Sequence, residues 1–247
     1  MIDTFLKTYE DRKKELKNFV NLLEFLEKTE NKKDESGTSE FENIFHQGDF
    51  TITFTYQQLI NVLKSNASLM IYSIIEFTVA NLVESIYDEI KVHKLSYIDV
   101  SDSIRILWSK SILKNANDPN ASFNTFLRRH EKVIQDILCC HVATMTSKQT
   151  MPAGNLDGET IKDTFAAHGI KIFTKSANYR PDLLKSIKES RNDLAHGSVS
   201  FVEALQQKSI LDIKSTSVIV VLFLDELVEL VQGYIEQQMF KAEEKYY

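Results

Sequence analysis

Glycine and proline are scarce in this chain, and their scarcity constrains the fold more than any other feature. The 247 residues include 7 glycines and 3 prolines, whereas soluble proteins average about 7% glycine and 5% proline. Both residues interrupt or end helices. The sequence therefore predicts an all-α protein with long, uninterrupted helices.

Apolar residues recur at helical intervals over several long segments. Residues 57–92 contain neither glycine nor proline, so we expect a central helix of roughly 50 Å there, at about 1.5 Å per residue. Amphipathic helices are expected over 2–26 and 217–244. Shorter helices are expected over 101–113, 123–145, 158–168 and 181–196, and after Ser200, which forms a capping-box pattern with Glu203.

One stretch near the N-terminus lacks this periodicity. Residues 29–50 are polar and charged, so we expect a mobile loop within a single domain that spans residues 1–247. Residues 51–56 alternate apolar and β-branched side chains, which favours a short extended segment. One isolated strand would leave the all-α class unchanged. A break is also expected over 147–153.

Charge and targeting signals narrow the classes of function. The formal net charge is -6, whereas a protein that coats nucleic acid is usually basic, because phosphate neutralisation supplies most non-specific affinity. Any nucleic-acid contact must therefore be local. The first residues show no secretory signal pattern, and the most apolar stretch, 68–83, is short for a membrane span and contains Glu76 and Asn81. We expect a cytoplasmic protein without a membrane segment.

The sequence offers no familiar cofactor or metal motif. It contains no G-x-x-x-x-G-K-[ST], G-x-G-x-x-G or H-E-x-x-H pattern. Cys139, Cys140 and His141 are consecutive, and successive helical residues point about 100° apart, so they cannot converge on one ion. Two adjacent cysteines also suit a reducing compartment. We expect neither metal nor cofactor, and a structural or solvent-facing role for His46, His93, His130 and His168.

The segment RNDLAHG at 191–197 carries a set of residues suited to chemistry on RNA. Asn192 and His196 are four residues apart and share a helix face, while Arg191 lies about 140° from His196 and must reach round with its long side chain. Histidine ordinarily titrates near neutral pH and can act as general acid or base. Arginine can clamp a phosphate, and asparagine can donate to it or orient the histidine. The set suits metal-independent attack of a ribose 2′-hydroxyl on the adjacent phosphate.

Spacing alone leaves a structural interpretation open. Arg191 could pair with Glu189 or Asp193, while His196 caps the C-terminus of the helix. Lys185 and Lys188 precede the motif at helical spacing, which predicts a local RNA-binding patch. The alternative for these lysines is an ordinary solvated helix face.

RNDLAHG resembles the signature of the HEPN superfamily, an arginine usually followed by a polar residue, with a histidine four to six residues after the arginine. Three further segments, GNLDGETIKDTFAAHGI at 154–170, SFVE at 200–203 and LMIYSIIEFTVANLVESIYDEI at 69–90, are similar to MAE-type HEPN-like nucleases of bacterial conflict loci. The resemblance covers about 69–201, and the first 65 residues show no specific match.

The resemblance implies an all-α, HEPN-like helical bundle with long central and C-terminal helices. It also implies a metal-independent endoribonuclease that acts on RNA as a homodimer, with the two motifs meeting at one cleft. The implied setting is toxin–antitoxin or anti-phage defence, in which a cognate antitoxin protein would be a partner. Arg191, Asn192 and His196 carry over as catalytic residues, and Glu76 as an accessory group whose alternative role is an ion pair with a neighbouring cation.

Two other functions stay open at this point. One is a non-catalytic HEPN module that binds a partner protein or nucleotide and keeps the motif for structure. The other is a helical scaffold that dimerises through the last long helix. An intact arginine, asparagine and histidine set favours the nuclease, because a purely structural module has no chemical need for all three.

Overall fold

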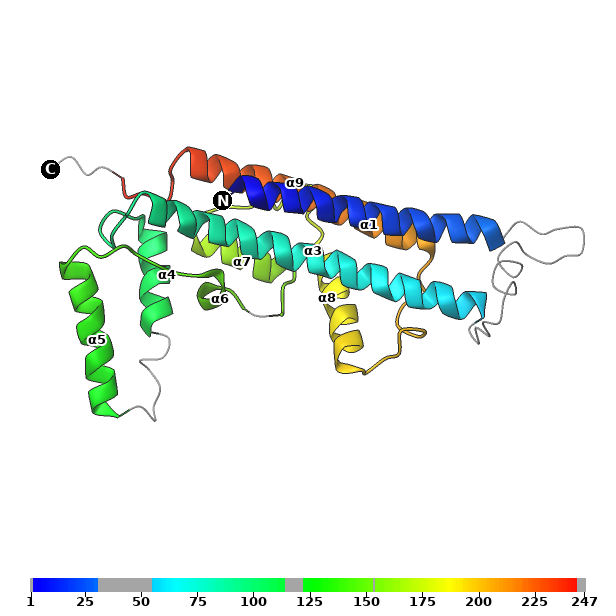
Figure 1. Cartoon of the computed structure of the whole chain (residues 1–247), viewed down its shortest axis with the longest axis horizontal. Helices are drawn as coiled ribbons and strands as arrows, with labels where there is room; N and C mark the ends of the chain where they lie inside the picture. Colours follow the sequence, from blue (N-terminus) through cyan, green and yellow to red (C-terminus); the bar gives the residue numbers. More distant parts are fainter. Residues whose placement is uncertain (1, 31–54, 114–121, 153, 244–247) are drawn as a thin grey trace, which may run out of the picture. The chain divides into compact units, whose positions relative to one another are not determined.

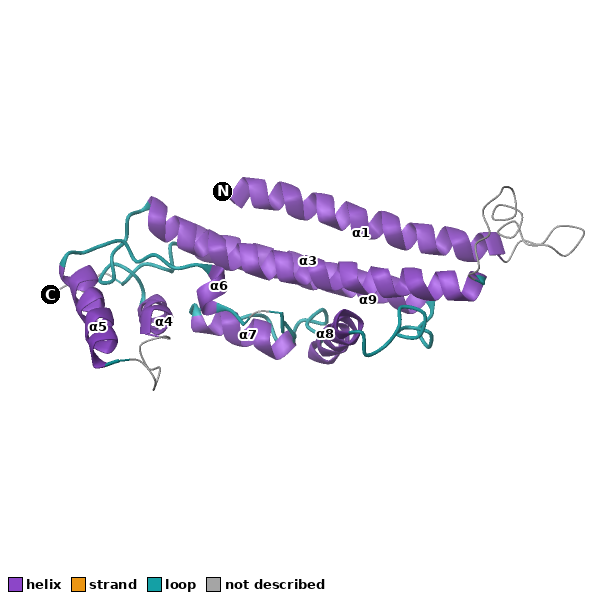
Figure 2. Cartoon of the chain, turned by 60° about the horizontal axis from the view of Figure 1, so that its bottom comes forward, coloured by secondary structure: helices purple, strands orange, loops and turns teal. Residues whose placement is uncertain are grey.

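All regular elements in the described part of the chain are helices, which confirms the all-α prediction. The computed structural model describes residues 2–30, 55–113, 122–152 and 154–243. Figure 1 labels the helices in chain order, and Figure 2 separates helix from loop. They are α1 (Ile2–Glu30), α3 (Tyr56–Val92), α4 (Asp102–Leu113), α5 (Phe123–Leu138), α6 (Ser147–Thr150), α7 (Gly158–Ala167), α8 (Pro181–His196) and α9 (Ile210–Glu236).

The predicted central helix is confirmed as α3, with 37 residues. No glycine or proline interrupts it, and many of its apolar side chains, from Ile60 to Ile90, are buried. The starts of α7 and α8 are also confirmed. The Asp157 side chain accepts a hydrogen bond from the Thr160 amide and caps α7, while Pro181 occupies the first position of α8, where a missing N–H costs nothing.

The predicted end of α5 is wrong. The helix stops at Leu138 rather than Met145, because Cys140 adopts the left-handed backbone conformation with φ of 51° and Val142 then forms an isolated β-bridge with Ser96. The predicted break over 147–153 contains one short helix, α6.

Both predicted ends of α9 are also wrong. The helix begins at Ile210 rather than Ser217, because Ser209 and Asp212 form a reciprocal cap. The Ser209 amide donates to Asp212 Oδ2 over 2.8 Å, and the Asp212 amide donates to Ser209 Oγ over 3.1 Å. At the other end, Gln238 has a φ of 53°, and the helix stops at Glu236 instead of 244.

The capping box at Ser200 forms, but no helix follows it. Ser200 Oγ donates to Glu203 Oε2 over 2.7 Å, and residues 201–207 are turns. The loop predicted over 29–50 and the extended segment predicted over 51–56 fall almost entirely outside the described residues. α1 continues to Glu30, and Tyr56 begins α3.

The chain divides into two compact units. Unit 1 comprises residues 1–5, 76–181 and 224–247, and unit 2 comprises residues 6–75 and 182–223. α3 and α9 each contribute one end to each unit. The single domain over 1–247 stays a prediction.

Unit 1 encloses a buried histidine. His168 is 0% exposed, with Nδ1 2.7 Å from the Thr164 carbonyl oxygen and Nε2 2.6 Å from Tyr87 Oη. The Tyr87 hydroxyl also lies 2.7 Å from Thr150 Oγ1. Burial lowers the pKa of His168, so the fold favours its neutral ring. His168 is therefore a buried, hydrogen-bonded residue of the core, and of the two predicted alternatives the solvent-facing one does not apply to it.

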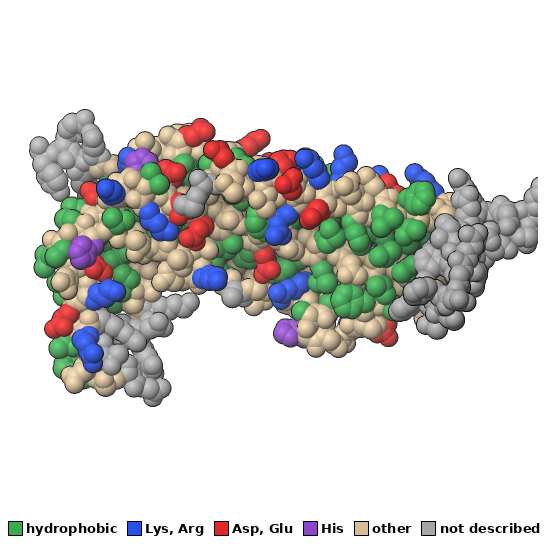
Figure 3. Space-filling model, in the orientation of Figure 1, with side chains coloured by type: hydrophobic (Ala, Val, Ile, Leu, Met, Phe, Trp, Pro, Cys, Tyr) green, Lys and Arg blue, Asp and Glu red, His purple; other side chains and the backbone are tan. Residues whose placement is uncertain are grey.

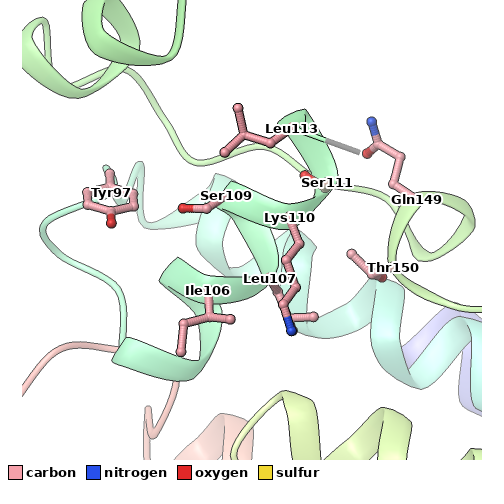
Figure 4. Close-up of a pocket in the computed structure, with 9 residues that line it drawn as sticks. All are labelled: Tyr97, Ile106, Leu107, Ser109, Lys110, Ser111, Leu113, Gln149 and Thr150. Carbon is pink, nitrogen blue, oxygen red and sulfur yellow. The ribbon is translucent and has the colours of Figure 1, made fainter. Parts of the chain in front are cut away.

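Thr150 also lines a pocket of about 570 Å³ in unit 1. Figure 4 shows α4 residues between Tyr97 on one side and Gln149 and Thr150 on the other. The hydroxyl chain from Thr150 through Tyr87 thus links the wall of this pocket to His168.

Unit 2 is held together by contacts among its long helices. α1 runs alongside α3 in both views (Figures 1 and 2), and Arg12 Nη1 donates to Ser73 Oγ over 3.4 Å. α9 is tied to α1 by an ion pair of 2.6 Å between Lys214 Nζ and Glu24 Oε1. These helices form the support on which α8 packs.

α3 is long and apolar enough to cross a membrane by length and composition, yet 56% of its most apolar window is buried inside the protein. Core helices of soluble proteins meet the same criterion. Ile75, Val79 and Leu82 are each 0% exposed. Packing in the core therefore explains why this helix is so apolar. The absence of a membrane segment stays a prediction.

Candidate active site

α8 turns one side to the core of unit 2 and the other to solvent. Its buried side chains are Leu184, Ile187 and Leu194, spaced as the inner face of a helix requires. Asn192 is half-buried and His196 is exposed. Because these two are four residues apart, they lie on the same outer face.

α8 ends at His196, immediately before a glycine in the left-handed conformation. Gly197 has a φ of 69°, its amide donates to the Leu194 carbonyl over 3.3 Å, and the Ser198 amide donates to the Asp193 carbonyl over 2.9 Å. This pair of bonds is the Schellman motif. A Cβ at position 197 would meet nothing within 4 Å, so the glycine is needed for its backbone conformation. The motif histidine thus occupies the last, solvent-facing position of the helix.

Arg191 reaches round the helix toward the core. Its guanidinium carbon lies 5.1 Å from the centre of the Tyr72 ring, and Nη1 donates to Asn192 Oδ1 over 3.1 Å. Tyr72 is 1% exposed, so the packing of α3 fixes the ring on which Arg191 rests. The described contacts of Arg191 include no carboxylate, so the predicted pairing with Glu189 or Asp193 is not observed.

Tyr72 is the site residue that sequence reasoning missed. It lies within the 69–90 segment that resembles HEPN nucleases, but a tyrosine in a nearly continuous apolar run has the pattern of a core residue. Only the fold brings it under an arginine on another helix. A planar guanidinium stacks readily on an aromatic ring, and this pairing sets the direction of Arg191.

The loop after the motif is fastened to α3 by two buried polar side chains. Lys64 Nζ donates to the Lys208 carbonyl over 2.7 Å, and Ser65 Oγ donates to the Phe201 carbonyl over 2.8 Å. Burial lowers the pKa of Lys64, and Asp212 and Glu27 oppose that shift. α3 therefore supports the motif from two directions, through the arginine and through the loop beyond the histidine.

The predicted basic patch is weaker than its sequence suggests. Lys185 Nζ lies 4.0 Å from Glu189 Oε1, which offsets its charge, and Lys188 is half-buried. On the face drawn in Figure 3, basic and acidic side chains are interspersed. RNA binding by Lys185 and Lys188 stays a prediction.

Glu76 belongs to unit 1, whereas the motif belongs to unit 2. It lines a pocket of about 350 Å³ together with Lys148 and Met151. The structure thus gives Glu76 an environment of its own, and its accessory role in the motif site stays a prediction.

Within the described residues, no group of three or more histidine, cysteine, aspartate or glutamate side chains is arranged to hold a metal ion. Cys139 and Cys140 are both exposed thiols. His141 Nδ1 lies 2.9 Å from Asp136 Oδ1, which gives the histidine a different partner. The expectation of neither metal nor cofactor stays a prediction.

A family model described as MAE_28990-like HEPN (HEPN_MAE_28990) matches residues 1–240. The chain belongs to this HEPN family. The match includes the first 65 residues, where the sequence alone showed no specific resemblance. No curated protein and no solved structure is significantly similar to the chain. Since HEPN domains are commonly ribonucleases, membership supports a nuclease-like or RNA-related module.

Proposed function

We propose that this HEPN protein is a metal-independent endoribonuclease whose catalytic residues are Arg191, Asn192 and His196. The observation that carries the proposal is the support of Arg191. Its guanidinium lies over a buried ring and donates to Asn192, and of its five N–H donors only one has a partner among the described residues. The remaining donors suit a phosphate.

The reaction would begin with attack of a ribose 2′-hydroxyl on the adjacent phosphate. His196 would remove or supply the proton, since an exposed imidazole at a helix end can reach a bound substrate. Arg191 would stabilise the charge that develops on the phosphate oxygens. The 5′-oxygen leaves and takes up a proton, so the products are a 2′,3′-cyclic phosphate and a 5′-hydroxyl.

Incubation of the purified chain with bulk RNA and a chelator tests this proposal. We expect cleavage that leaves 2′,3′-cyclic phosphate ends, and its loss in the His196→Ala and Arg191→Ala variants. His141→Ala is the matched control, because it removes an exposed histidine outside the motif. Strict dependence on magnesium or manganese, or 5′-phosphate ends, would falsify the mechanism.

A non-catalytic module that binds a partner protein or nucleotide is the second candidate, and one observation favours it. The contacts of Arg191 with Tyr72 and Asn192 would also suit an arginine kept for structure. The two functions differ in what Arg191→Lys does. Lysine keeps the charge but loses the planar fork, so a nuclease would lose activity while folding changes little.

We further propose a two-fold homodimer in which both copies of His196 face one cleft. Transesterification needs one group to take a proton and another to give one, yet each chain has a single motif histidine, and an isologous interface supplies the second. Mixing wild-type chains with an excess of His196→Ala chains tests it. Activity should fall below the share of wild-type chains if the cleft is shared, because each mixed dimer holds a single His196, and should follow that share if each chain acts alone.

The cellular role that suits such an enzyme is a cytoplasmic toxin or anti-phage effector held in check by a cognate antitoxin. Support for this role is the family resemblance of the motif. Induced expression of the wild-type chain should arrest bacterial growth and degrade cellular RNA, while His196→Ala should do neither. Growth arrest by both chains would show that toxicity does not come from the motif.

A further inference from the structure

α5 carries an apolar stripe that the described part of unit 1 leaves exposed. Its members are Phe123, Leu127, Ile134 and Leu138, with exposures of 73%, 43%, 56% and 77%. At about 100° per residue they fall within about 60° of one another around the helix. This α5 stripe consists of two pairs of large apolar side chains, separated by about 10 Å along the helix at about 1.5 Å per residue, and such surfaces mark sites of association.

The α5 stripe differs from the face that holds α5 to its own chain. α5 packs against α4, and its half-buried apolar residues, Val133 and Ile137, lie on a neighbouring face. The helix is therefore apolar on two faces, and within the described residues of unit 1 only one of them is half-buried. The second face leaves room for a separate occupant.

We propose that this occupant is the α5 stripe of a second copy of the chain, packed antiparallel. The intervals between the four residues are 4, 7 and 4, so the stripe reads the same in both directions. A two-fold axis between residues 130 and 131 places Phe123 opposite Leu138 of the second copy, and Leu127 opposite Ile134. An isologous contact requires this self-complementary pattern.

The charges beside the stripe suit the same arrangement. Arg128 and Glu131 are exposed and lie about 60° apart around the helix on one flank of the stripe. In an antiparallel pair, the flank that carries Arg128 and Glu131 lies beside the same flank of the second copy. Arg128 therefore comes beside Glu131 of the second copy. A parallel pair would bring opposite flanks together and lose this match.

Charge also favours a second copy over a strongly charged partner. α5 balances Arg128, Arg129 and Lys132 against Glu131 and Asp136, so two copies of the helix meet without strong repulsion, although the whole chain has a net charge of -6. This contact uses unit 1 only. It is therefore independent of the proposed nuclease and of the shared cleft in unit 2.

Light scattering on the purified full chain tests the contact through its mass. Leu127→Glu should at least halve the mass of the wild-type assembly and leave far-UV circular dichroism unchanged. The matched control is Leu211→Glu, which places the same charge at an exposed leucine of α9, 68% exposed. A monomeric wild type, or an assembly that Leu127→Glu leaves intact, would overturn the proposal.

Disulfide trapping tests the antiparallel register. The background is Cys139→Ser with Cys140→Ser, which removes both exposed thiols. Positions 127 and 134 lie about 10 Å apart on one helix, beyond the roughly 7 Å that a disulfide can span between Cα atoms. In the proposed pair, position 127 lies opposite position 134 of the second copy, so the two copies of position 127 are separated by the same distance along the helix. Leu127→Cys and Ile134→Cys should each stay uncrosslinked alone, and the double variant should form covalent dimers on mild oxidation. Dimers from either single variant, or none from the double variant, would overturn the register.

Discussion

Lowering the pH should reduce the free energy of unfolding of this protein, because His168 is buried as a neutral ring. His168 is 0% exposed, and burial lowers its pKa below the usual 6.5. The unfolded chain therefore takes up a proton as the pH falls below about 6.5, while the folded chain does not. Stability from this group is fully present above that pH and is lost as the pH falls. The loss between pH 7.5 and 5.5 is at most about 1.4 kcal/mol, the value reached when the buried ring is still neutral at pH 5.5.

Urea unfolding at these two pH values measures the effect, with His168→Gln as the reference. Glutamine does not titrate, so the contributions of the other histidines cancel when the two chains are compared. The difference in unfolding free energy between wild type and variant should shrink at pH 5.5, by at most about 1.4 kcal/mol. An unchanged difference would refute the assignment of a neutral, buried His168.

Two further predictions concern unit 2. Tyr72→Leu should lower kcat for RNA cleavage about 10-fold, since a cation–π contact contributes about 1 to 2 kcal/mol when desolvated, while Tyr72→Phe keeps the ring and should stay near wild type. Equal losses in both variants, or a loss that only follows the melting temperature, would contradict a positioning role. Joint replacement of Lys185 and Lys188 by glutamate should weaken RNA binding and flatten its dependence on salt by a slope of about 1; unchanged binding would identify them as a solvated helix face.

Sequence patterns predicted helices best where local signals agree. The scarcity of glycine and proline anticipated α3, and caps at Asp157 and Pro181 anticipated α7 and α8 within a residue or two. The start of α9 was missed although its Ser209–Asp212 cap is local, whereas the end of α5 was missed because a tertiary contact decides it. α5 has helical periodicity beyond Leu138, yet Val142 bridges Ser96, and no pattern local to α5 reveals that partner.

In the candidate site, too, some features depend on neighbouring residues in the sequence and others on residues far away in it. The spacing from Arg191 to His196 and the glycine that follows are local, so the sequence was enough to propose the catalytic set and the end of the helix. The orientation of Arg191 is not local. It depends on Tyr72, a residue far away in sequence whose apolar surroundings give no hint of a polar neighbour.

Because the orientation of Arg191 depends on Tyr72, α3 contributes to the candidate site although the motif itself lies on α8. A bare arginine on the inner side of α8 would point toward the core, where an unpaired charge is costly. The ring of Tyr72 gives the guanidinium a cation–π partner at the boundary of the core, and Asn192 Oδ1 accepts a hydrogen bond from Nη1. Asn192 therefore connects the two halves of the motif, because it bonds Arg191 and shares a face with His196. In the proposed mechanism, this bond would hold the arginine in place before a phosphate binds, which is the role we propose for a polar residue directly after the arginine.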